Sequence, residues 1–263
     1  MPQERLYRTE AIVVRRADLG EADRLLTIIT PGRGKLRVVA KGARKVGSRK
    51  SGHVELFTRT NLLIAKAREL DIVSQAETVE AYRPLREDLL RSTYAHYFAE
   101  LLDRFTGEEE DIGELYGLLA DSLSRLCDAP TQRTALVARY YELHLLALAG
   151  YQPRLFDCVH CGKPLREIES ESPPYGFDCA QGGVLCDRCA PNSRDAMPLS
   201  LAVLKVLRHA ARVEWTVFAT LNLRPLVARE VEQTLQRYIT YILERQLKSV
   251  EFLRTLRLEM TTG

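Results

Sequence analysis

Four of the six cysteines stand in two closely spaced pairs, the pattern in this sequence with the most definite chemistry. Cys158 and Cys161 form one C-x2-C pair, Cys186 and Cys189 form the other, and 24 residues separate them. A tetrahedral zinc ion takes four thiolates at about 2.3 Å, and each C-x2-C turn presents two thiolates together. The spacing therefore predicts one structural Zn2+ per chain, held by these four cysteines.

Other uses of paired cysteines fit less well. Disulfides belong to oxidising compartments, and we expect a cytoplasmic protein because no secretory signal opens the chain. Redox C-x-x-C motifs usually come singly beside a βαβ pattern. Four thiolates leave no open position for a catalytic metal. His160 and Cys179 are spare donors that we expect outside the ligand set, and Cys127 is expected to be a buried thiol.

One short motif resembles an enzyme signature. His53-Val54-Glu55 matches the H-x-E half of a zinc deaminase motif, but neither C-x-x-C pair is preceded by proline. We interpret His53 and Glu55 as solvent-side residues of a strand. The sequence also has no G-x-x-x-x-G-K-[ST] loop and no H-E-x-x-H pairing. We therefore expect a protein that is not an enzyme and that takes no nucleotide cofactor.

A second candidate site is a basic stretch without acidic residues. It has few apolar residues and a Gly/Ser-rich turn, so phosphates are its natural counter-charge. We predict that it binds the phosphates of a nucleic acid, with a solvated surface loop as the alternative. Its eight basic residues are Arg33, Lys35, Arg37, Lys41, Arg44, Lys45, Arg49 and Lys50.

The elements that must position these groups differ along the chain. The first 80 residues alternate like short strands separated by Gly-rich turns, which favours a five-stranded OB-fold barrel. The period becomes helical from Pro84, and Gly150 is a predicted helix end. The fold class is thus α+β and multidomain, with an α-helical bundle carrying the four-cysteine insert. The expected strands are 7–14, 25–30, 35–40, 55–66 and 70–79, and the later helices are 112–126, 131–148, 199–212 and 229–247.

These patterns predict a domain order. We expect an OB-fold DNA-binding domain at 1–80, the first part of a helical domain at 81–155, a zinc-binding insert at 156–190 and the second helical part at 191–263. A small β-hairpin or loop is expected between the two cysteine pairs.

Composition fits this organisation. The 263 residues are 46% hydrophobic and 28% charged, the balance of a globular protein. The apolar runs are too short to span a bilayer, so no membrane contact is expected. Residues 1–80 hold 16 Lys and Arg against 10 Asp and Glu, a net of +6, whereas the whole chain has a net charge of +3. This asymmetry indicates that the basic N-terminal part meets a polyanion.

Three segments resemble the family of the bacterial recombination mediator RecO. They are GEADRLLTIITPGRGKLRVVAKGARK at 20–45, GYQPRLFDCVHCG at 150–162 and FDCAQGGVLCDRC at 177–189. The resemblance covers nearly the whole chain. It implies a DNA repair factor that binds single- and double-stranded DNA and anneals complementary strands. It also implies contact with the acidic C-terminal tail of single-strand-binding protein, joint action with RecR in loading RecA, and association with the nucleoid.

Two questions stay open at this point. An RNA-binding factor of transcription or translation, with an OB-fold and a zinc ribbon, is the alternative function, although aromatic residues on the barrel are few. The pocket for an acidic tail has two candidate rims on the helices, with Leu204 and Leu207 as a possible apolar floor for the second. The rims are Arg125, Arg133 and Arg139, or Lys205, Arg208 and Arg212; the alternative for either set is a solvated helix face.

Overall fold

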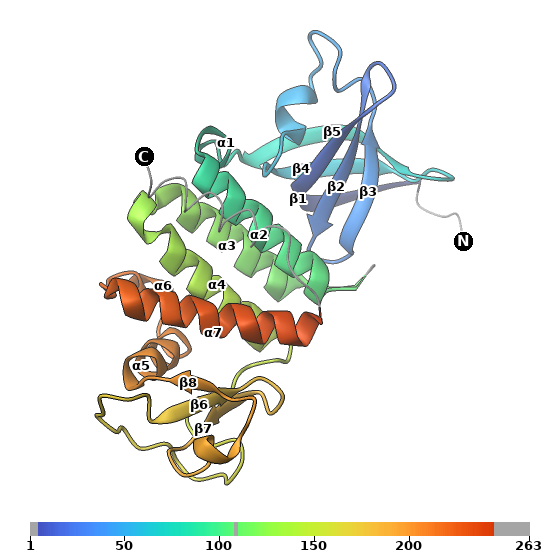
Figure 1. Cartoon of the computed structure of the whole chain (residues 1–263). Coiled ribbons are helices and arrows are strands. Elements are labelled where there is room, and N and C mark those ends of the chain that lie inside the picture. Colours follow the sequence, from blue (N-terminus) through green and yellow to red (C-terminus); the bar gives the residue numbers. More distant parts are fainter. Residues whose placement is uncertain (1–4, 108–109, 245–263) are drawn as a thin grey trace. The chain divides into compact units, whose positions relative to one another are not determined.

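The computed structural model of the chain describes residues 5–107 and 110–244. The polypeptide forms two compact units, which divide after Thr131. Within these described residues, the first unit holds five strands followed by three α-helices, and the second holds four α-helices and a small sheet (Figure 1).

The five strands of the first unit form a closed barrel in the order β1-β2-β3-β5-β4. Neighbours pair antiparallel except β3 and β5, which run parallel where Val38 and Val39 face Asp71 and Ile72. This connectivity agrees with the predicted five-stranded OB-fold. The strands are β1 (Leu6–Leu19), β2 (Asp23–Thr30), β3 (Gly34–Ala40), β4 (Arg59–Ala65) and β5 (Asp71–Glu80).

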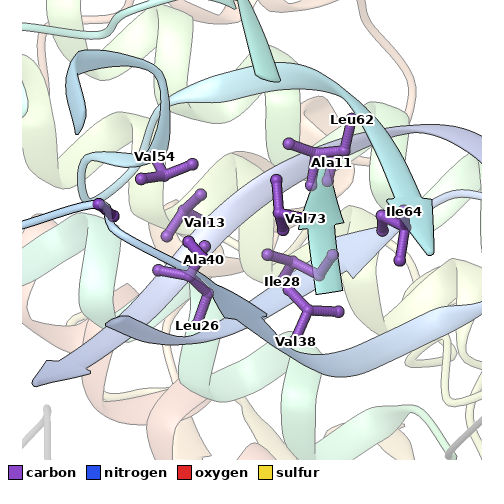
Figure 2. Packing of buried hydrophobic residues seen from close by; sticks show 11 residues of the cluster. Ala11, Val13, Leu26, Ile28, Val38, Ala40, Val54, Leu62, Ile64 and Val73 are labelled. Carbon is purple, nitrogen blue, oxygen red and sulfur yellow. The ribbon is translucent and has the colours of Figure 1, made fainter. Parts of the chain in front are cut away.

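The inward side chains of the barrel form one aliphatic core (Figure 2). Alternate residues enter it, for example Leu26 and Ile28 from β2 and Val38 and Ala40 from β3. Because successive side chains on a strand point to opposite faces, Leu25, Thr27, Arg37 and Val39 project from the barrel. The period-2 pattern thus determines which basic residues can meet a ligand.

The predicted strand at 55–66 begins later than expected. A short 3-10 helix (Ser51–Val54) precedes it, and Phe57 is fully buried with φ of 59°, a left-handed conformation that interrupts extended backbone. The Phe57 ring packs edge-on against His96, with 4.8 Å between the ring centres. The expectation that His53 and Glu55 lie on a strand was therefore wrong.

Three helices complete the first unit: α1 (Pro84–Glu87), α2 (Leu89–Phe105) and α3 (Gly113–Asp128). Pro84 begins α1, and the Asp88 carboxylate caps α2 by accepting from the Arg91 amide at 2.9 Å. The Tyr116 hydroxyl of α3 donates to Glu10 on β1 at 3.0 Å, and Arg59 on β4 donates to the same carboxylate. These polar contacts join the helices to the barrel.

The second unit contains α4 (Thr134–Leu148), α5 (Leu201–Ala210), α6 (Trp215–Phe218) and α7 (Pro225–Leu243). A one-turn 3-10 helix (Thr131–Arg133) leads into α4, which ends before Gly150 at φ of 84°, as predicted. The Ser200 hydroxyl caps α5 by accepting from the Val203 amide. The helix expected at 229–247 starts four residues earlier, at Pro225, and residues 245–247 lie outside the described part of the chain.

The cysteine-bearing segment lies between α4 and α5. Strands β6 (Tyr175–Asp178) and β7 (Gly183–Leu185) form the hairpin expected between the cysteine pairs. A third strand, β8 (Met197–Leu199), pairs with the other edge of β6 and was not predicted. A 3-10 helix (Ala190–Asn192) follows the second cysteine pair.

Candidate metal centre and nucleic-acid interface

The two C-x2-C pairs come together at one point of the second unit. The sulfur atoms of Cys158, Cys161, Cys186 and Cys189 all lie within 4.8 Å of one another. Tetrahedral bonds to zinc would hold sulfur atoms about 3.8 Å apart. Within the residues that the structure describes, this is the one place where three or more cysteine, histidine or acidic side chains gather closely enough to bind a metal.

Each pair is held in a turn that aims its thiols inward. The Cys158 carbonyl accepts from the Gly162 amide at 2.9 Å, and the Cys186 carbonyl accepts from the Cys189 amide at 3.0 Å. The Cys186 amide also points at the Cys158 sulfur, at 3.3 Å. The second turn directly follows the β6-β7 hairpin, so the hairpin brings it to the first.

Two glycines make this approach possible. Gly182 has φ of 71°, in the left-handed region that favours glycine. A Cβ atom on Gly183 would lie 2.5 Å from the Arg154 carbonyl oxygen and 2.6 Å from a Val159 methyl group. A side chain at Gly183 would therefore push the first cysteine turn away from the hairpin.

The electrostatics of the four thiols fit a divalent cation. Burial raises the pKa of Cys158, but amide donors from Cys161, Cys186 and His160 outweigh it and lower the pKa to about 6. The neighbouring thiols raise the pKa of Cys189 to about 12. One thiolate forms readily while a second one beside it is disfavoured, so four thiolates need a cation between them. The donor set suits Zn2+, bound by thiolates alone.

The other candidate donors lie elsewhere. His160 is exposed, and neither it nor Cys179 belongs to the group of close ligand atoms. Cys127 at the end of α3 is half-buried, and burial raises its pKa to about 11. His53 and Glu55, the two residues of the deaminase-like motif, bind protein groups instead: His53 contacts Thr78, and Glu55 pairs with arginines.

Four of the eight predicted DNA-binding residues contact other parts of the first unit. Arg33 lies over the Tyr7 ring at 4.5 Å, and Lys35 forms an ion pair with Asp103 of α2. Arg44 pairs with Asp18 at 3.3 Å, and Lys50 donates to the Val73 carbonyl at 3.0 Å. These four side chains therefore stabilise the folded unit.

The remaining four are available to a ligand. Arg37, Lys41, Lys45 and Arg49 are exposed and form no ion pair with any residue of the described ranges. Arg37 projects from β3, and the other three lie on the loop between β3 and β4, which we call the basic loop (residues 41–50). The sequence pattern grouped all eight residues, and only tertiary contacts separate them.

The strand register adds a residue that the sequence reasoning missed. Arg15 on β1 pairs with Thr27 on β2, which in turn pairs with Arg37 on β3. These side chains form a row across the outer face of the barrel, and the next row contains Ala17, Leu25 and Val39. The signal in the sequence is the pair of adjacent arginines, Arg15 and Arg16, which marks this part of β1 as basic. A β-bulge between Val13 and Arg15 places Arg15 on this face.

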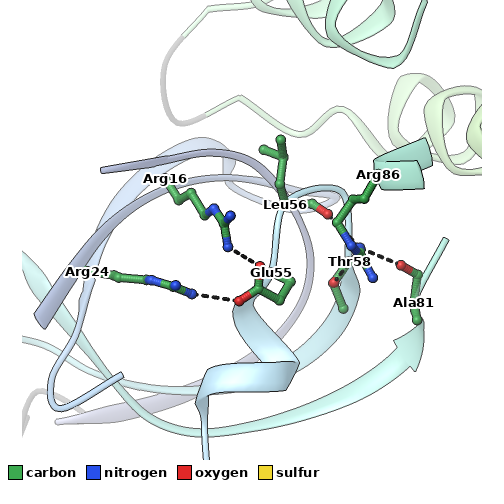
Figure 3. A network of polar contacts seen from close by, with 7 residues as sticks. All are labelled: Arg16, Arg24, Glu55, Leu56, Thr58, Ala81 and Arg86. Carbon is green, nitrogen blue, oxygen red and sulfur yellow. Dashed lines mark hydrogen bonds and ion pairs between the residues drawn. The ribbon is translucent and has the colours of Figure 1, made fainter. Parts of the chain in front are cut away.

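Arg16 and Arg24 point the other way, into one end of the barrel. There they meet the Glu55 carboxylate, which forms ion pairs with both guanidinium groups (Figure 3). Arg86 of α1 donates to the carbonyl groups of Leu56 and Ala81 nearby, at 2.8 and 2.7 Å. This network closes the barrel end, and its two barrel arginines share the single Glu55 carboxylate as their counter-charge.

The first candidate rim for an acidic tail is largely engaged within the protein. Arg139 is buried and pairs with Glu142 at 2.7 Å, Arg133 donates to the Ala219 carbonyl, and Arg125 pairs with Asp121. The predicted floor of the second rim was wrong, because Leu204 and Leu207 are fully buried in the core.

The second rim does line a cavity of about 520 Å3 in the second unit. Phe156 forms its apolar wall, with Arg212 at 3.8 Å and Arg208 at 5.3 Å from the ring centre. Lys205 lies at the same cavity and pairs with Glu167 at 3.0 Å. Arg208 also donates to two backbone carbonyl groups, at 2.8 and 3.3 Å, so it is the exposed Arg212 that the cavity offers to a ligand beside the aromatic ring.

Comparison with known proteins gives a consistent result. A model described as Recombination protein O N terminal matches residues 3–82, and one described as Recombination protein O C terminal matches residues 86–251. DNA repair protein RecO of Roseiflexus sp. (strain RS-1) is 42% identical over 99% of this chain and 89% of its own length. The protein of the same name from Desulforudis audaxviator is 39% identical over 94% of this chain and 96% of its own length. The one from Symbiobacterium thermophilum is 35% identical over 96% of this chain and 98% of its own length.

No helix in the described ranges has both the length and the apolar character required to cross a bilayer.

Proposed function

Because the chain belongs to the RecO family of DNA repair proteins, we propose that it binds single- and double-stranded DNA through one basic face of its barrel and promotes annealing of complementary strands. The observation that carries this proposal is a set of exposed cations that form no ion pair with any residue of 5–107 or 110–244. They are Arg15, Arg37, Lys41, Lys45 and Arg49.

The arrangement suits contact with phosphates rather than recognition of base sequence. The Arg15-Thr27-Arg37 row crosses three strands, so a backbone lying on this face meets two guanidinium groups and a hydroxyl group. Contacts to phosphates release counterions and are independent of sequence. Two strands whose phosphates are screened in this way repel each other less, so pairing proceeds without ATP.

The test measures DNA affinity across salt concentrations. The triple variant Lys41→Gln, Lys45→Gln, Arg49→Gln removes three cations that make no ion pair in the described structure. If each contacts one phosphate of single-stranded DNA, the slope of log affinity against log salt falls by about 2. Annealing of complementary oligonucleotides slows in the same variant.

A matched control removes three charges from the second unit. Arg224, Arg229 and Arg237 are exposed on or beside α7, and their change to Gln alters the net charge equally. An unchanged slope in the loop variant, with a reduced slope in this control, would show that DNA binds the second unit. That result would refute the barrel proposal.

The metal has a structural role in this proposal. Cys158, Cys161, Cys186 and Cys189 hold one Zn2+, which crosslinks the two turns around the β6-β7 hairpin. The strands of this segment are only three or four residues long, and metal binding adds folding free energy to the packing of their buried side chains. Residues 156–190 thereby form the zinc-binding part of the chain.

Membership of the RecO family also suggests partner proteins. We propose that the chain acts with RecR to load RecA and that it binds the acidic C-terminal tail of single-strand-binding protein, in the cytoplasm at the nucleoid. The cavity beside Phe156 supports the tail contact, because the exposed Arg212 guanidinium can pair with a carboxylate while the ring contacts an apolar end.

Calorimetric titration tests the tail site. An acidic tail peptide that ends in an apolar residue should bind the wild-type protein and bind an Arg212→Ala variant at least about tenfold more weakly, because charged hydrogen bonds are lost. Arg237→Ala on α7 is the control and should leave binding unchanged. Equal affinity in the Arg212 variant would exclude this cavity.

A further inference from the structure

The tip of the basic loop presents an aliphatic side chain to solvent. Val46 has a relative exposure of 106%, the highest of the exposed large hydrophobic residues in the described structure. It lies within a run of cations that includes Lys45 and Arg49. A valine this exposed buries no apolar surface in the free protein, so the apolar surface of Val46 can stabilise only a bound state.

The loop that carries Val46 is ordered by its own hydrogen bonds. The Lys45 amide donates to the Gly42 carbonyl at 3.2 Å, and the Ser48 amide donates to the Lys45 carbonyl at 3.1 Å. Gly42 and Gly47 on either side of the tip have φ of 67° and 77°. These turns fix where Val46 projects, so a partner meets a preformed tip and little ordering entropy is lost on binding.

A second aliphatic side chain lies on the neighbouring turn. Leu19 at the end of β1 is 40% exposed. The basic loop and the β1-β2 turn are bound directly to each other: the Arg44 amide donates to the Ala22 carbonyl at 2.9 Å, and the Gly42 amide donates to Asp23 at 2.7 Å. The Arg44 side chain adds a hydrogen bond to the Gly20 carbonyl. Two apolar residues are therefore displayed by one joined pair of loops.

The surrounding charge defines the chemistry of the partner. Lys41, Lys45 and Arg49 favour a polyanion, and Val46 in their midst favours a partner with apolar surface behind its charges. Single-stranded nucleic acid has this construction, because phosphates lie outside and base faces become accessible once unstacked. Apolar side chains of minor-groove-binding proteins insert between the base steps of duplex DNA, which shows that such groups can contact base faces.

We propose that Val46, with Leu19 on the adjacent turn, contacts the faces of unstacked bases in single-stranded DNA whose phosphates are held by the basic loop. This inference rests on the proposed DNA-binding function. In a barrel with few aromatic residues, the aliphatic tip takes the place of a stacking platform. It holds a strand with its bases separated and ready to pair.

The test uses substitutions that leave the charge unchanged. Val46→Ser removes the apolar contact, Val46→Leu retains it, and Val79→Ser changes a half-exposed valine on β5 as the matched control. We expect Val46→Ser to bind single-stranded DNA about three- to tenfold more weakly, as for the loss of a few buried methyl or methylene groups. Because no cation is lost, this ratio stays constant as salt rises, and Val46→Leu and Val79→Ser bind like the wild type.

A spectroscopic readout reports base contact directly. Oligonucleotides containing 2-aminopurine change their fluorescence when the base unstacks, so the wild type and Val46→Leu should shift the signal at saturation and Val46→Ser should shift it less. Equal affinity and equal fluorescence for Val46→Ser would overturn the inference while leaving DNA binding intact. Failure of the wild type to bind any DNA would instead refute the proposed function and this inference together.

An anionic membrane also has an apolar interior behind negative charge. Vesicles of phosphatidylglycerol and phosphatidylcholine, sedimented with the same variants, distinguish the two partners. Vesicle binding that depends on Val46, with DNA binding that does not, would overturn the assignment to bases.

Discussion

Cys158 is the most buried of the four clustered cysteines, and three backbone amides stabilise its thiolate. At the residue scale it is therefore the ligand whose loss should matter most. We predict that Cys158→Ser lowers the zinc content from one per chain to near zero. The free energy of unfolding should fall by a few kcal/mol, because metal binding and folding of the segment are coupled.

The control for this prediction is Cys179→Ser, which changes a half-buried cysteine outside the cluster. Elemental analysis of both purified variants, together with urea unfolding, gives the comparison. Retention of a full equivalent of zinc by the Cys158 variant would show that the ligand set is wrong.

Gly183 is the second residue whose environment makes a sharp prediction. A methyl group there would approach the Arg154 carbonyl to 2.5 Å, so Gly183→Ala should destabilise the protein by about 1–3 kcal/mol, the usual cost of overpacking. Gly117→Ala is the opposite case, because nothing lies within 4 Å of its Cβ position in α3. That change should stabilise the protein by up to about 1 kcal/mol. Thermal unfolding of both variants measures the contrast, and equal effects would contradict the packing at Gly183.

Among the elements of the first unit, the strands at one end of the barrel are joined by ion pairs. Glu55 holds Arg16 from β1 and Arg24 from β2, in a segment that is half-exposed to solvent (Figure 3). Replacing Glu55 with Gln leaves two guanidinium groups without their counter-charge. We predict a loss of about 1 kcal/mol, a modest value because solvent screens the pairs.

The control is Glu21→Gln on the exposed β1-β2 turn, which should change stability by less than about 0.5 kcal/mol. Urea unfolding at low and high salt checks the cause, since the Glu55 effect should shrink when ionic strength rises. A Glu55→Gln effect that does not depend on salt would assign the loss to packing instead.

At the scale of the whole molecule, buried tyrosines set the response to alkaline pH. Burial raises the pKa of Tyr82 to about 12, and it also raises the pKa values of Tyr116 and Tyr141. An unfolded tyrosine ionises near pH 10. The stabilising contribution of these residues is therefore complete below about pH 10. It is lost as pH rises from 10 toward 12, where the unfolded state binds fewer protons.

Urea unfolding at pH 8, 10 and 11.5 should show a falling midpoint over the last interval. Tyr141→Phe removes one buried hydroxyl and should flatten this decline, whereas Tyr241→Phe, on an exposed position of α7, should leave it unchanged. A midpoint that stays constant up to pH 11.5 would contradict the role of the buried phenols.

Features that depend on local pattern could be predicted from the residues alone. Alternating apolar residues specify strands, and the Gly-rich turns between them fix the hairpins, so the five-stranded barrel was predictable. The two C-x2-C pairs likewise indicated a cluster, because each pair brings two thiols together within one turn. Local spacing is sufficient where the interacting groups are close in the chain.

Which of the basic side chains are available to bind a ligand depends on contacts made in the folded protein. Arg44 and Lys45 are adjacent and both basic, yet Arg44 forms an ion pair with Asp18 and Lys45 makes no ion pair within the described ranges. Arg15 and Arg16 differ in the same way, since a β-bulge and strand pairing send them to opposite faces. Glu55 was misplaced because the left-handed Phe57 breaks the expected strand. Each outcome depends on partners distant in sequence, whose positions only the folded chain defines.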